Sequence, residues 1–145
     1  MAKTFTSPFP QSPRTSAAVT TMATPLTGVG SIGTNTPINT VPLLTAGIDG
    51  ALVTRITALP RATVADTGLQ LYLRRATDAV DVRHLIDAET MVAYGLAAST
   101  TPKATVFSLY NEGTPLRLAA GDELHVGAAV ALAGGICFRA EYTDF

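Results

Sequence analysis

From about residue 40 onward, the chain consists of short apolar runs that are separated by turn residues. Within these runs, apolar side chains recur at every second position. In the segment 68–75 (GLQLYLRR), three leucines at every second position alternate with polar or aromatic side chains, which predicts a strand with one buried face. The same alternation and the turn residues around it predict six further strands, over residues 40–44, 51–59, 82–86, 104–110, 124–132 and 136–142. In segment 87–98 a helical spacing competes, but Val92 and Gly95 favour a strand or a single turn.

The spacing of these elements predicts the fold class. Turn residues recur every 8 to 12 positions and no long helical pattern interrupts them, which favours an all-β antiparallel β-sandwich or jelly roll. The expected core residues occupy the apolar face of two of the predicted strands: Leu69, Leu71, Leu73, Ile136 and Phe138.

The first forty residues have a different pattern. Six of the nine prolines lie within the first 42 positions, among ten Thr and four Ser, and such punctuation disfavours helices and central strands. We therefore predict two parts, an extended and largely irregular N-terminal arm over residues 1–39 and a β-sandwich domain over residues 40–145. The domain is expected to fold without the arm.

Apolar residues are spaced along this polar arm, and we predict that they anchor it to a partner surface. Val29 belongs to this pattern, and the predicted partner-binding residues are Phe5, Phe9, Val19, Met22, Leu26, Ile32 and Ile38. Since the arm carries only the charges of Lys3 and Arg14, its binding should depend weakly on salt.

Composition narrows the possible functions. The 145 residues carry a formal net charge of -1, which disfavours a nucleic-acid partner. The sequence shows no apolar leader and no stretch of about 20 apolar residues, so we expect a chain made without a signal peptide and without a membrane partner. Only 14% of residues are charged, and a surface rich in small and hydroxyl side chains suits burial in a homo-oligomer or larger assembly.

We predict no catalytic, cofactor-binding or metal-binding residues from the sequence, and we therefore expect that the protein is not an enzyme. A G-x-G-x-x-G pattern at residues 28–33 lies in the arm, where no helix can follow to bind a dinucleotide. His84 and His125 lack a second ligand at metal-site spacing, so both are interpreted as solvated strand residues. Asp122 is expected to cap a turn, and Cys137 to face away from the core.

Three segments of the domain resemble the small β-sandwich structural proteins of tailed bacteriophages. The segments are TVPLLTAGIDGALVTRI (40–56), LAAGDELHVGAAVA (118–131) and AEYTDF (140–145). The resemblance covers residues 40–145 and implies a virion component of the head decoration or cement type, with the major capsid protein as partner. Family habit implies a trimer. No catalytic residue carries over from the resemblance.

A receptor-binding or carbohydrate-binding module of a phage tail or head fibre is the alternative function. Sugar sites commonly offer aromatic platforms beside clustered Asp and Asn, and this chain has no Trp and only 6% aromatic residues. The sequence therefore favours the structural role.

Overall fold

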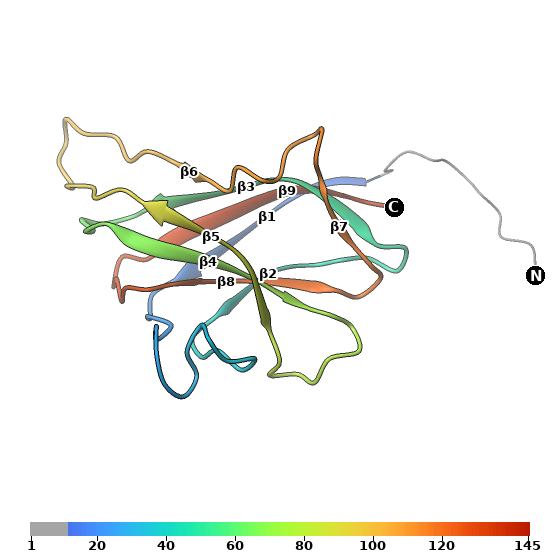
Figure 1. The fold of residues 1–145 in the computed structure, drawn as a ribbon. Helices are drawn as coiled ribbons and strands as arrows, with labels where there is room; N and C mark the ends of the chain where they lie inside the picture. Colours follow the sequence, from blue (N-terminus) through green and yellow to red (C-terminus); the bar gives the residue numbers. More distant parts are fainter. Residues whose placement is uncertain (1–11) are drawn as a thin grey trace, which may run out of the picture.

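The structure is a computed structural model that describes residues 12–145, in which the chain forms nine strands and no helix (Figure 1). The strands are β1 (Ser12–Thr20), β2 (Val41–Thr45), β3 (Ala51–Pro60), β4 (Thr67–Arg74), β5 (His84–Met91), β6 (Thr105–Val106), β7 (Leu116–Leu118), β8 (Glu123–Ala128) and β9 (Ile136–Asp144).

The strands form two antiparallel sheets that pack face to face. Sheet A has the order β1-β9-β3-β6, and β7 also pairs with β3, whereas sheet B has the order β2-β8-β4-β5. Strands β1 and β2 contact each other on one side of the stack, and β5 and β6 do so on the other side. The predicted all-β antiparallel sandwich is confirmed.

The core lies between the two sheets and is built from the inward positions of the long strands. Leu69 and Leu71 of β4 and Ile136 and Phe138 of β9 belong to this core, and all four side chains are completely buried. These four core predictions are confirmed, while Leu73 is only half-buried at the rim of the core.

Strand β1 is the main difference from the sequence prediction, which placed residues 12–20 in an irregular arm. All nine residues of β1 pair with β9, from Ser12 opposite Asp144 to Thr20 opposite Ile136. An edge strand can contain proline, because one side of its backbone needs no ladder hydrogen bond, and Pro13 lies near the start of β1. The predicted boundary at residue 40 is therefore wrong, since the sandwich already includes Ser12–Thr20.

Other strands differ from their predicted lengths where the chain turns to fill the core. The strand predicted over residues 104–110 ends at Val106, and Phe107 turns inward, is completely buried and donates its backbone N–H to the carbonyl of Ile56. Strand β8 ends at Ala128, four residues earlier than predicted, and β7 has no counterpart among the predicted strands. Strand β5 runs through Met91, as a strand rather than a helix.

Candidate interaction surface

Residues 21–40 form an irregular segment, here called the covering loop, that folds back onto the outer face of sheet B. Thr24 donates its backbone N–H to the Ala128 carbonyl at 2.8 Å, and its hydroxyl donates to the Ile38 carbonyl at 2.9 Å. Farther along the loop, the carbonyl of Asn35 accepts the backbone N–H of Arg83 at 2.7 Å. The loop is thus tied to both β8 and the β4–β5 connection, and it is not an extended arm.

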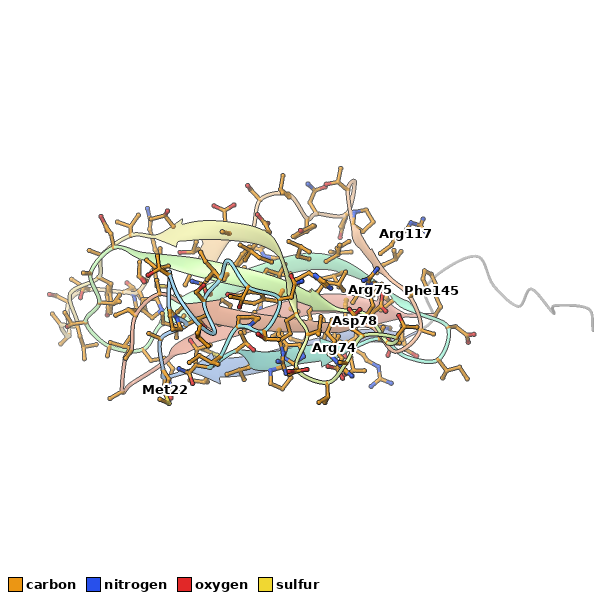
Figure 2. All side chains as sticks on the ribbon, turned by 60° about the horizontal axis from the view of Figure 1, so that its bottom comes forward. Met22, Arg74, Arg75, Asp78, Arg117 and Phe145 are labelled. Atoms are coloured by element: carbon orange, nitrogen blue, oxygen red, sulfur yellow. The ribbon has the colours of Figure 1, made fainter. Side chains whose placement is uncertain are left out.

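The covering loop carries four exposed large apolar side chains, here called the apolar loop surface. The exposed fractions are 60% for Met22, 58% for Leu26, 97% for Val29 and 50% for Ile38. Figure 2 shows Met22 at the opposite end of the molecule from Arg117 and Phe145. Contiguous exposed apolar patches often mark surfaces that bind another protein, which makes this loop a candidate for such a surface.

The other predicted anchors do not join this surface. Val19 lies on β1 opposite Cys137, on the outer face of sheet A, and Ile32 is half-buried within the covering loop. Phe5 and Phe9 lie outside the described residues.

A hollow of about 450 Å³ separates the covering loop from the β4–β5 connection. Val29, Gly30 and Ile38 line it on one side, and Asp81 and Arg83 line it on the other. Gly30 has a positive φ of 73°, and a Cβ there would lie 2.8 Å from the Ile38 side chain, so only glycine fits. Gly30 of the G-x-G-x-x-G pattern therefore shapes a turn of the loop.

Beneath the covering loop, a polar cluster is buried on the outer face of sheet B. The Tyr72 hydroxyl donates to Oε1 of Gln70 at 3.0 Å, and Tyr72, Gln70 and Thr24 are each no more than 3% exposed. Burial raises the pKa of Tyr72 to about 12. A Cβ at Gly127 would lie 2.8 Å from Gln70 and 2.9 Å from Thr24, so the glycine lets the loop pack closely on β8.

His125 is the centre of a neighbouring charged network and is only 4% exposed. The Arg83 guanidinium donates through Nε to His125 Nδ1 at 3.1 Å, which requires a neutral ring with its proton on Nε2. Nε2 in turn donates to Oε2 of Glu123 at 2.9 Å, and Arg74 pairs with Oε1 of Glu123 at 3.0 Å. Burial is the main reason that the pKa of His125 lies below its usual value.

We expect acid to destabilise the protein through His125. Because the pKa of this ring is lower in the folded than in the unfolded chain, the unfolded state binds more protons once the pH falls below about 6.5. The free energy of unfolding, measured by denaturant titration, should therefore decrease from neutral pH toward about pH 5. In a His125→Gln variant this dependence should become flatter.

The matched control for this prediction replaces the other histidine. His84 lies 3.5 Å from Asp78 at the start of β5, and a His84→Gln variant should keep the dependence because it retains His125. Equal slopes in the wild type and the His125→Gln variant would contradict the prediction.

The polar cluster was not predicted from the sequence, because Gln70, Tyr72 and His125 were all expected to face solvent. Their alternation with leucines places them correctly on the outer face, but no local signal shows that a distant loop covers that face. The interpretation of His125 as a solvated residue is therefore wrong.

The structure agrees with the expectations for Asp122 and Cys137. The Asp122 carboxylate accepts the backbone N–H groups of Ala119 and Ala76 at 3.0 and 3.1 Å, so it holds the β7–β8 turn against the β4–β5 connection. Cys137 lies on the outer face of sheet A and is half-buried.

Among residues 12–145, no group of three or more His, Cys, Asp or Glu side chains could hold a metal ion. The same residues contain no helix with the length and apolar character needed to cross a bilayer. Comparisons with protein-family models, with curated proteins and with solved structures give no match to this chain.

Proposed function

We propose that this chain is a non-enzymatic structural protein of a tailed-phage virion, which decorates or cements the head. In this proposal the apolar loop surface seats against the major capsid protein. The fold class fits such a role, and the resemblance of residues 40–145 to phage β-sandwich proteins supplies the virion context.

The observation that carries the proposal is the concentration of exposed apolar side chains on one loop. Met22, Leu26, Val29 and Ile38 are each at least 50% exposed within a single segment of twenty residues. Burying such side chains against a partner is favourable by about 25 cal/mol for each Å² of apolar surface removed from water.

The way the loop is held also supports a binding role. Backbone hydrogen bonds of Thr24 and Asn35 to the body keep the loop in one arrangement before any partner arrives. A surface ordered in advance loses less conformational entropy on binding, so more of the contact energy appears as affinity.

The test uses virus particles that lack this chain and purified protein added back to them. A variant with Met22, Leu26, Val29 and Ile38 all replaced by Ser should show an apparent affinity for the particles that is lower by about tenfold or more. Bound protein is quantified by mass spectrometry of particles separated from free protein.

The control variant replaces four equally exposed apolar residues on other loops. Ile48, Val80, Val92 and Leu96 are 63–88% exposed, and their replacement by Ser should leave particle binding unchanged. Binding of the first variant at wild-type level would refute the role of the apolar loop surface, and absence of the wild-type chain from purified virions would refute the virion role.

A further inference from the structure

The outer face of sheet A differs from that of sheet B because its side chains remain open to solvent. Leu59 and Val106 are each 39% exposed, and the Arg139 and Glu141 side chains are 50% and 43% exposed. Hollows of about 290 and 330 Å³ also lie on this face, and both include Thr54 and Glu141 among their lining residues.

The register of β1, β9 and β3 arranges this face in four rows of side chains across the three strands. From the β8–β9 turn toward the C-terminal end of β9, the rows are Val19–Cys137–Leu59, Ala17–Arg139–Thr57, Thr15–Glu141–Arg55 and Pro13–Thr143–Leu52. The two outer rows are uncharged, and the two inner rows carry the charges. In the middle of the face, Arg139 and Glu141 form an ion pair at 2.7 Å.

We infer that this face packs against the same face of a second copy of the chain. The two copies are related by a two-fold axis that lies between the two facing copies of sheet A and runs across the strands at the level of Ala140. Each β9 then lies over the β9 of the other copy in the opposite direction. Sheets that pack face to face keep their strands aligned to within about 30°, which this arrangement satisfies.

The charge pattern selects this axis. With the axis at Ala140, Arg139 of each copy lies over Glu141 of the other copy, so two ion pairs form across the interface. The third charge of the inner rows, Arg55, lies beside Glu141 of its own chain. The uncharged Cys137 row of one copy covers the uncharged Thr143 row of the other. An axis parallel to the strands would instead stack Arg139 on Arg139, and like charges placed opposite each other in an interface are unfavourable.

The projected area of the face is somewhat smaller than one side of a standard protein interface. At about 3.3 Å per residue and 4.8 Å between strands, the nine paired residues of β1 and β9, with β3 and β6 beside them, span roughly 30 by 19 Å. Because the side chains make the face uneven, its accessible area is larger than this projected area. Standard interfaces bury about 800 Å² on each partner. Arg117 of β7 pairs with Leu52 at the end of one outer row and is exposed.

The proposal is tested by exchanging the two central charges. The molar mass of the purified chain, measured by light scattering after size exclusion, should equal two chains. Arg139→Glu and Glu141→Arg each place like charges opposite one another and should weaken the dimer by about tenfold or more. The double variant Arg139→Glu with Glu141→Arg restores opposite charges and should recover the dimer.

Cys137, the one cysteine of the chain, provides a second measurement on the unmodified protein. Its reaction rate with a thiol reagent should fall as protein concentration rises, because the dimer covers it. A mass of one chain would overturn the inference, and a mass of three chains would favour the trimer implied by the resemblance. The inference would also be overturned if the single variants form the dimer as well as the wild type does, or if the double variant fails to restore the dimer.

Discussion

Removal of residues 2–38 is expected to abolish the cooperative unfolding transition of the protein. The deletion takes away β1, and with it all nine register pairs to β9, so β9 becomes an uncovered edge next to the core. It also removes Thr24 from the outer face of sheet B and exposes Gln70 and Tyr72, which are now buried. Circular dichroism during heating should show a broad transition or none.

A shorter deletion provides the control for this experiment. A chain that lacks residues 2–11 keeps every strand of the structure and should unfold at nearly the wild-type temperature. A sharp, wild-type-like transition in the chain without residues 2–38 would mean that residues 40–145 fold independently, as their composition alone suggested.

Phe107→Ala is expected to lower the free energy of unfolding by about 3 to 5 kcal/mol. Phe107 is completely buried and follows directly after β6, where only two residues pair with β3. Truncation of the ring leaves a cavity in the core, and the loss of stability rises with the volume that neighbouring groups cannot fill. Since domains of this size are stable by only about 5–15 kcal/mol, the loss should be readily visible in urea denaturation.

Leu109→Ala is the matched control for the Phe107 substitution. Leu109 lies two residues farther along the same segment and is 61% exposed, so its truncation should change the free energy of unfolding by less than about 0.5 kcal/mol. Equal losses in both variants would show that the segment stabilises the fold through its backbone and not through the Phe107 ring.

The periodic part of the fold could be predicted because its signal is local. Alternation of leucines in β4 and of apolar residues in β9 identified the strands and the inward residues Leu69, Leu71, Ile136 and Phe138. Strand β1 gave no such signal, because its inward positions are small or polar, such as Ser16 and Ala18. Its strand conformation comes from pairing with β9, more than a hundred residues away in the sequence.

The candidate surface was predictable only in part, for the same reason. Apolar residues in a polar, proline-rich stretch were predicted to be partner-binding anchors, and of these Met22, Leu26 and Ile38 are exposed in the structure. Their role in binding stays a prediction. The burial of His125 was not predictable, because it depends on contact between the covering loop and sheet B.

Because Ser12 pairs with Asp144, the start of β1 and the end of β9 lie at the same end of the sandwich. Strand β1 leads from this pair to the covering loop over about 30 Å, given 3.4 Å for each of its nine residues. In Figure 1 the C-terminal end of β9 accordingly lies far from the loop. A peptide fused after Phe145 would therefore lie at the opposite end of the sandwich from the covering loop, so a tag or foreign epitope placed there should leave the loop accessible.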